Sequence, residues 1–162
     1  MRVFHGSTEI VDHPDVLSGR NNLDFGKGFY LTNLEAQAVS WASRPLNASK
    51  RKYLNIYELD LESVLASGYR YVKYSEYDGL WLDFVVSNRK GGDGWRKFDV
   101  IEGGIANDRV FNTIELYSSG LITKDEALQR LVYEKPNNQI CILNQSVADG
   151  YLSFVEAREI GK

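Results

Sequence analysis

The sequence predicts an α+β fold in a single domain. Segments with the alternating pattern of strands are mixed with segments of helical spacing, and the two types do not alternate strictly, which favours α+β over a doubly wound sheet. The 162 residues are a common size for one domain, and no repeat, low-complexity stretch or linker divides them. We therefore expect strands and helices packed around one core.

The expected elements follow the chain in order. Strands are predicted at residues 2–7, 28–31, 53–60, 69–74, 98–101, 139–143 and 151–155. Helices are predicted at residues 32–44, 77–90, 107–119 and 123–131. Thr32-x-x-Glu35 and Thr123-x-x-Glu126 have the spacing of capping boxes, and Gly120 is placed to end the third helix.

Composition sets ordinary bounds on function. Hydrophobic residues at 43% and charged residues at 25% are typical of a soluble globular protein. The net charge of −3 argues against a surface that grips nucleic acid throughout, although a local basic groove is compatible with it. Cys141 is the only cysteine, so no intramolecular disulfide can form, and two histidines offer no transition-metal cluster. Without a signal-like or membrane-spanning run, we expect a cytoplasmic protein.

Two short motifs near the start carry the functional signal. The first is His5-Gly6-Ser7, at the end of the first predicted strand, and the second is Gly26-Lys27-Gly28-Phe29-Tyr30, at the start of the next. Gly26 and Gly28 are expected to adopt positive φ or to let a ligand approach the backbone. Each motif offers an edge that can face a ligand, and the two together are a more specific signal than a Gly-x-Gly turn alone.

The pair of motifs resembles the NAD-binding core of the ADP-ribosyltransferase superfamily. The resemblance is to the branch of the poly(ADP-ribose) polymerases and their bacterial relatives, where the first strand carries His-Gly-Ser or His-Gly-Thr and the second Gly-Lys-Gly-aromatic-Tyr. A wider pattern resembles one uncharacterised bacterial family of this superfamily, in segments 23–25, 81–84, 105–109 and 138–140. The resemblance implies an ADP-ribosyltransferase-like fold over residues 1–162, with a split antiparallel or mixed β core flanked by helices, and it implies NAD as the substrate.

The resemblance also assigns roles. Tyr30 matches the tyrosine that stacks on the nicotinamide ring, and Trp41, eleven residues on, matches the aromatic that closes the sandwich; both could instead be core aromatics. His5 matches the histidine that binds a ribose hydroxyl of the adenosine half, and the Gly6 backbone meets the nicotinamide amide. The implied NAD-binding set is completed by other residues of the two motifs and the intervening loop: Ser7, Arg20 and Gly28.

The third position of the family departs from the pattern. Polymerising relatives carry a glutamate at the start of a late strand, where this chain has Asn138-Gln139-Ile140. We align Gln139 with the glutamate, because Cys141 would then share its face of the strand, although the register could select Asn138. A neutral amide can bind a ribose hydroxyl, but it can neither neutralise developing positive charge nor act as a general base.

The resemblance therefore implies single transfer and not polymer synthesis. We expect an NAD-dependent mono-ADP-ribosyltransferase that uses Gln139, Tyr30 and His5, needs no metal and modifies a protein or a nucleic acid. Such an intracellular effector would be the toxin of a toxin–antitoxin pair or a phage-defence component, with an antitoxin as a possible partner. A catalytically inactive NAD- or ADP-ribose-binding module and an NAD glycohydrolase are the alternatives. Asp83 and Asp108 are two carboxylates that could compensate for the missing glutamate. Alternatively, Asp83 is a carboxylate on a helix surface, and Asp108 is a negative charge at a helix N-terminus.

Overall fold

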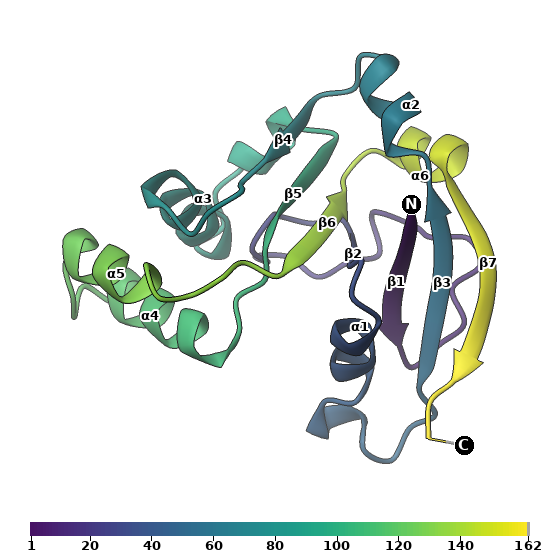
Figure 1. Cartoon of the computed structure of the whole chain (residues 1–162), viewed down its shortest axis with the longest axis horizontal. Helices are drawn as coiled ribbons and strands as arrows, with labels where there is room; N and C mark the ends of the chain where they lie inside the picture. The colour runs from purple at the N-terminus through teal and green to yellow at the C-terminus, as the bar shows by residue number, and fades with distance from the viewer. Residues whose placement is uncertain (162) are drawn as a thin grey trace.

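The computed structural model describes residues 1–161 and contains two β-sheets (Figure 1). In the first sheet, β3 (Tyr53–Leu59) lies between β1 (Arg2–Ser7) and β7 (Leu152–Glu159), and both pairs are antiparallel. The second sheet has the order β2-β6-β5-β4, with bounds Phe29–Leu31, Asn138–Ile142, Val100–Gly104 and Tyr71–Lys73. It is mixed, because β4 and β5 are parallel and the other pairs antiparallel.

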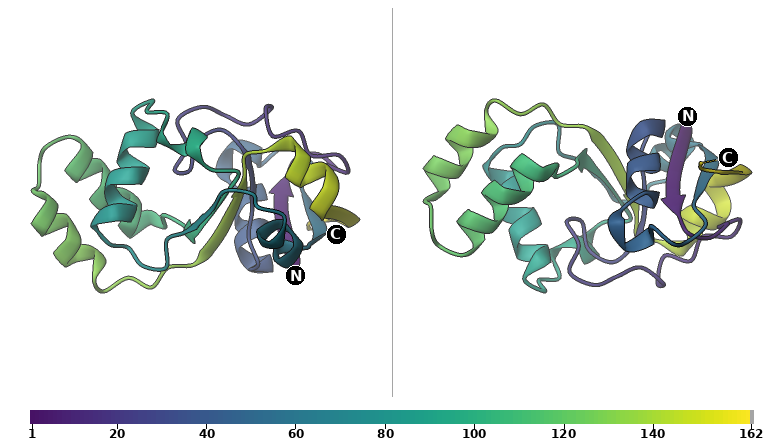
Figure 2. Two further views of the ribbon diagram at one scale, coloured as in Figure 1. Left: turned by 90° about the horizontal axis from the view of Figure 1, so that it is seen from above. Right: turned by 90° about the horizontal axis from the view of Figure 1, so that it is seen from below.

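The helices gather around these sheets. Helix α1 (Glu35–Ala42) lies beside β1, and α3 (Gly79–Arg89), α4 (Asp108–Ser118) and α5 (Lys124–Leu131) lie on the far side of the second sheet. Helices α2 (Leu61–Ala66) and α6 (Gln145–Tyr151) lie at one end of the sheets, and short 3-10 turns span Pro45–Asn47 and Gly94–Lys97. Figure 2 shows that α4 and α5 form one end of the molecule and β7 the other.

Strand β6 is buried on both faces. Ile140 and Ile142 pack into a core shared with Phe29, Leu31 and strands of the first sheet, whereas Cys141 packs on the opposite face with α3 and α4. Two-sided burial explains the nearly continuous apolar run Ile140-Cys141-Ile142, because no face of this strand meets water.

The two sheets meet at a single backbone bridge. Phe4 N–H donates to Thr32 C=O at 2.8 Å, and Thr32 N–H donates back to Phe4 C=O at 3.0 Å. This exchange places the C-terminal half of β1 next to β2, although the two strands belong to different sheets.

Most sequence expectations hold. The α+β class is confirmed, and the strand at 2–7 and the helix capped by Thr123 have the predicted ends, with both hydrogen bonds of the capping box formed. Gly120 ends α4 at φ +75°. The strand expected at 98–101 is instead β5, Val100–Gly104, because residues 94–98 are taken by a 3-10 turn and its end. Helices α2 and α6 were not predicted.

The capping box predicted at Thr32 is wrong. Helix α1 begins at Glu35, its N-cap is Leu34, and no side chain caps it. The Thr32 hydroxyl donates to Asn138 C=O at 2.7 Å and accepts from Leu34 N–H at 3.1 Å. Thr32 therefore fastens β2 to β6 and does not cap the helix.

A buried carboxylate clamps one end of the second sheet. Asp99 accepts hydrogen bonds from the Arg70 amide at 2.7 Å, from Arg70 Nη2 at 2.9 Å and from Asn144 Nδ2 at 3.1 Å. The bonds from Arg70 lower the pKa of Asp99 to about 2. The clamp joins the starts of β4 and β5 to the residue that caps α6.

We predict that Asp99 makes the protein acid-sensitive. Its folded pKa lies below the ordinary value of about 3.9, so its stabilisation is present above pH 4 and is lost as the pH falls toward 2. Asp99→Asn should lower the free energy of unfolding by on the order of 1–3 kcal/mol at pH 6, and the difference should shrink below pH 3. Urea unfolding across this range measures it. The exposed Asp93 makes no cap bond, so the unfolding free energy of Asp93→Asn should change with pH in the same way as that of the wild type. The same pH dependence in Asp99→Asn as in the wild type would contradict the prediction.

Candidate functional site

The candidate site is built around the junction of β1 and β2. The half-buried His5 ring lies 4.4 Å from the Phe29 ring, and its Nδ1 is 2.8 Å from Tyr30 C=O. A carbonyl only accepts, so Nδ1 carries the hydrogen, and burial lowers the pKa of His5. His5 is therefore a neutral imidazole whose Nε2 lone pair makes no hydrogen bond with the described residues.

Gly6 brings helix α1 against β1. A Cβ added there would lie 1.7 Å from Ala38 C=O, so any side chain would push the helix away. Ser7, the last residue of β1, accepts a hydrogen bond from Glu9 N–H at 3.2 Å through its hydroxyl. The His-Gly-Ser motif thus places a neutral imidazole, a close helix contact and a strand end at consecutive positions.

The hydroxyl of Tyr30 holds the Gly-Lys-Gly turn. It donates to Gly26 C=O at 2.6 Å and accepts from Phe25 N–H at 3.0 Å. Burial raises the pKa of Tyr30 well above its usual value, so the hydroxyl stays protonated and can make both bonds. The ring is half-buried against the core of α3 and α4.

The two glycines of the turn serve different purposes. Gly26 has φ +88°, as expected, and a Cβ there would lie 2.2 Å from the Trp95 ring. Gly28 does not have a positive φ; it permits close packing, because a Cβ there would lie 2.6 Å from Cys141 Sγ. Contacts within the protein therefore account for the backbone shape of this turn.

Helix α3 anchors the segment just before this turn. Asn88 Nδ2 donates to Asp24 C=O at 2.8 Å, and Arg89 Nε donates to Asp24 Oδ1 at 2.6 Å. Phe25 is fully buried, with ring centroids 6.4 Å from Tyr74 and 6.3 Å from Phe84. The Leu-Asp-Phe and Trp-Leu-Asp-Phe segments singled out in the sequence therefore belong to one packed unit.

Gln139 lies on the Tyr30 face of the second sheet. Tyr30 pairs with Cys141, and side chains two residues apart share a face. Gln139 is buried and donates from Nε2 to Gly104 C=O at 3.1 Å. Asn138 faces the other side, so it is Gln139 that shares a face with Tyr30.

Arg20 and Trp41 are not bonded to this arrangement. Arg20 is exposed on the loop before β2 and forms no ion pair with residues 1–161. Trp41 is half-buried on α1, the helix that packs on Gly6. No hydrogen bond, ion pair or aromatic ring contact joins either side chain to Tyr30 or Gln139 in the described part of the chain.

Sequence reasoning missed a buried glutamate. Glu102, on β5, accepts hydrogen bonds from Tyr71 Oη and from Asn138 Nδ2, the latter at 2.6 Å, and lies 3.6 Å from Lys73 Nζ. Asn138 Oδ1 is buried and has no hydrogen-bond partner among the described residues. The only feature of the sequence that could have revealed Glu102 is its place as a single acidic residue at the end of the strand-like run Val100-Ile101-Glu102. The network places a carboxylate on the strand next to Gln139.

The other singled-out side chains have structural surroundings. Asp83 accepts from Lys124 Nζ at 2.6 Å and from Tyr117 Oη at 3.0 Å, which ties α3 to α4 and α5. Asp108 is exposed at the first position of α4. Cys141 is fully buried, and burial raises the pKa of its thiol, so it is not a thiolate nucleophile.

Residues 1–161 lack two kinds of feature. They contain no group of three or more histidine, cysteine, aspartate or glutamate side chains placed to hold a metal ion. None of their helices combines the length and apolarity needed to cross a membrane.

We predict that removing the Tyr30 hydroxyl loosens the turn. Tyr30→Phe keeps the ring but leaves Phe25 N–H and Gly26 C=O without their partner, which should cost about 1–3 kcal/mol of unfolding free energy. Urea unfolding measures this loss. Tyr133 is 87% exposed, so Tyr133→Phe should leave stability unchanged. Equal stability of both variants would show that the hydroxyl does not hold the turn.

Comparison with known proteins leads to a family and not to an activity. No curated protein and no solved structure shows significant similarity to the chain. A family model described as a protein of unknown function matches residues 1–154, nearly the whole length. The chain with the His5–Tyr30 junction therefore belongs to the DUF3990 family.

Proposed function

We propose that this protein is an NAD-dependent mono-ADP-ribosyltransferase that modifies a macromolecule. The observation that carries the proposal is the state of His5. Its Nδ1–H is used by Tyr30 C=O, the imidazole is neutral, and Nε2 is left as an acceptor at the end of β1. An acceptor of this kind suits a ribose hydroxyl, the role implied by the sequence resemblance.

The reaction has simple requirements. The glycosidic bond between nicotinamide and ribose C1′ breaks, nicotinamide leaves as a neutral molecule, and a nucleophile of the acceptor bonds to C1′ and loses its proton. The site must hold both riboses and stabilise positive charge on the departing sugar. In this proposal His5 binds the adenosine ribose, Tyr30 and Trp41 contact the nicotinamide ring, and Gln139 binds a hydroxyl of its ribose.

Gln139 limits the chemistry to one transfer. An amide is neither a base for activating an acceptor hydroxyl nor a counter-charge for the sugar cation. Glu102, on the strand beside Gln139, is the nearest buried carboxylate, but Tyr71, Asn138 and Lys73 already engage it. Chain elongation would need a free general base, so the proposal is limited to mono-ADP-ribosylation.

The proposed setting is the cytoplasm. A small transferase of this type suits an intracellular effector, either the toxin of a bacterial toxin–antitoxin pair or a phage-defence component. Its acceptor is a protein or a nucleic acid, and an antitoxin protein would be its regulatory partner.

One observation favours a second candidate, a module that binds NAD or ADP-ribose without transfer. Gln139 is buried and already donates to Gly104 C=O, so it would have to exchange this bond for one to the ligand. An NAD glycohydrolase lies between the two candidates, because water can replace the macromolecular acceptor.

A labelling experiment separates the three functions. The protein is incubated with NAD radiolabelled in the adenylate phosphate and with whole-cell lysate, and the products are treated with protease or nuclease. Label that becomes macromolecular supports transfer, and its sensitivity identifies the acceptor class. Free ADP-ribose alone would indicate a glycohydrolase, and unreacted NAD with saturable binding would indicate a binding module.

We predict that His5→Ala weakens NAD binding on the order of tenfold, the effect of losing one hydrogen bond to the ligand. Calorimetric titration of NAD measures this change, with thermal unfolding as a check on folding. His13→Ala is the matched control, because the His13 side chain is 93% exposed and its contact is with the neighbouring Asp12. Absence of saturable binding to the wild-type protein at millimolar NAD would refute the assignment.

We predict a different effect for Gln139→Ala. If the amide acts mainly in the transition state, kcat and kcat/KM should fall together by an amount on the order of 2–4 kcal/mol, while NAD affinity changes little. Gln129→Ala, on the exposed side of α5, is the control. Because Gln139 also bonds Gly104, urea unfolding must show that the variant is folded at the assay temperature. Full turnover in the folded variant would contradict the assignment of Gln139, and Asn138 and Glu102 would be the next residues to test.

A further inference from the structure

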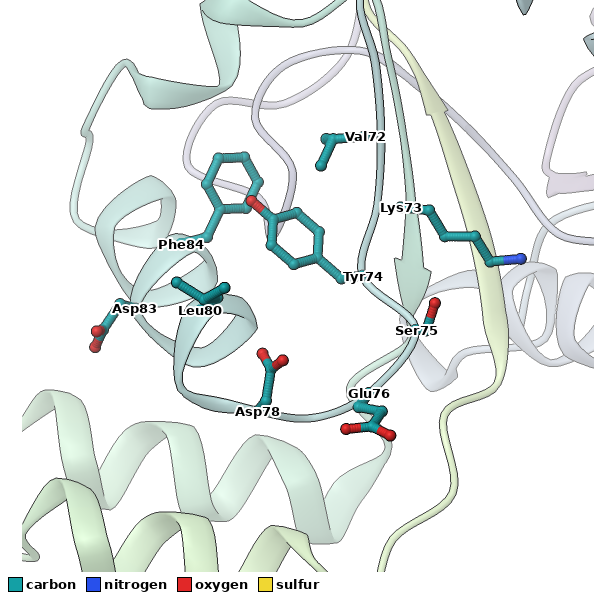
Figure 3. Close-up of a pocket in the computed structure, with 9 residues that line it drawn as sticks. All are labelled: Val72, Lys73, Tyr74, Ser75, Glu76, Asp78, Leu80, Asp83 and Phe84. Carbon is teal, nitrogen blue, oxygen red and sulfur yellow. The ribbon is translucent and has the colours of Figure 1, made fainter.

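A groove between β4 and α3 shares no lining residue with the His5 junction. Its volume is about 700 Å³, it is open to solvent, and Val72, Tyr74, Leu80 and Phe84 form its apolar floor. In Figure 3 the Tyr74 and Phe84 rings face each other, with centroids 5.1 Å apart, and Val72 and Leu80 lie beside them. Leu80 is the second residue of α3 and is 76% exposed. The next two residues of the helix, Trp81 and Leu82, are fully buried.

The groove runs along a free sheet edge. Strand β4 is the last strand of its sheet and pairs only with β5. Tyr74 N–H donates to Glu102 C=O at 2.8 Å, and Val72 stands opposite Ile101 in the register. Because successive residues of a strand direct their backbone groups to opposite sides, the N–H and C=O of Lys73 point away from β5. These groups have no partner among residues 1–161 and form a template for another strand.

The rim of the groove is acidic. Glu76, Asp78 and Asp83 line it, and Glu76 makes no ion pair with the described residues. Lys73 is the one cation of the lining, but Figure 3 shows its side chain extending away from the Tyr74 and Phe84 rings. Its amine lies 3.6 Å from Glu102, so its charge is directed to that buried carboxylate. Lys124 Nζ lies 2.6 Å from Asp83 Oδ2 and neutralises its charge. The negative electrostatic potential of the groove therefore comes from Glu76 and Asp78.

We propose that this groove binds an extended segment of a partner protein by adding a strand to the edge of β4. The backbone of the segment would pair with Lys73, and one or two apolar side chains would enter the floor at Tyr74, Leu80 and Phe84. Lysine or arginine residues beside them would face Glu76 and Asp78. Main-chain pairing supplies the affinity of such strand addition, and the pockets for alternate side chains supply its specificity. This proposal does not depend on the NAD chemistry.

A defined peptide tests it. The probe is a fluorescein-labelled peptide of about eight residues in which valine and leucine alternate with lysine, and the whole protein is titrated against it by fluorescence anisotropy. A second probe replaces lysine by glutamate, and a third carries N-methyl groups on alternate amides, which remove the donors needed for pairing. We expect saturable binding of the first probe and at least tenfold weaker binding of the other two. Equal binding of the basic and N-methylated peptides, or no saturation by millimolar protein, would overturn the proposal.

Matched variants locate the binding. Leu80→Ala and Glu76→Lys should each weaken the basic peptide at least fivefold without changing the melting temperature, because both side chains are exposed. Leu46→Ala, 84% exposed on a distant turn, and Glu62→Lys on α2 are the controls and should bind as wild type. Unchanged binding by the groove variants would contradict the site. Light scattering adds a last test, since dimerisation abolished by Leu80→Ala would mean that a second copy occupies the groove and would overturn a separate partner.

Discussion

The relation between the two sheets depends on the exchange of backbone hydrogen bonds between Phe4 and Thr32. It is the point where β1 of one sheet pairs with the end of β2 of the other, and His5 adds a side-chain bond to Tyr30 C=O one step farther along. Helix α1 can reach this junction because Gly6 has no side chain. The position of the His5 imidazole relative to Tyr30 is therefore set by main-chain geometry, and side-chain packing has little freedom to alter it.

The second sheet places polar side chains where apolar ones would be the simpler choice. Gln139 and Glu102 are both buried on the two central strands, and each is satisfied by a specific partner. Burying polar groups gains little stability over well-packed apolar residues, so stability alone does not explain this pair. The two groups face opposite sides of the sheet, with an amide on the Tyr30 side and a carboxylate on the other. A ligand bound on the Tyr30 face would meet the neutral group first.

The sequence predicted features that depend on residues close together along the chain, and it failed where the interacting residues are far apart along the chain. The α5 cap was predictable because Thr123 and Glu126 bond each other across one turn, and Gly120 ends α4 through its own backbone angle. The cap predicted at Thr32 was wrong because its hydroxyl donates to the C=O of Asn138, 106 residues away. No local sequence pattern encodes this contact. Glu102 was missed for a related reason, because a lone acidic residue in a short strand has the same local sequence whether it faces water or the half-buried Tyr71. The pairing of His5 with Tyr30 was expected only through resemblance to a known family, and the role of the Tyr30 hydroxyl in its own turn was not foreseen.

The order of strands along the chain has a consequence for how the protein forms during synthesis. Strand β6 lies between β2 and β5, and β7 pairs along the whole length of β3, yet both strands come after residue 137 in the sequence. Neither sheet can be completed from the first 137 residues, because each still lacks one strand. Contacts between such distant segments form slowly, as the loop between them must close first. During synthesis, β2 and β5 therefore cannot be joined through β6 until residues 138–142 have been made, and the second sheet is completed only then.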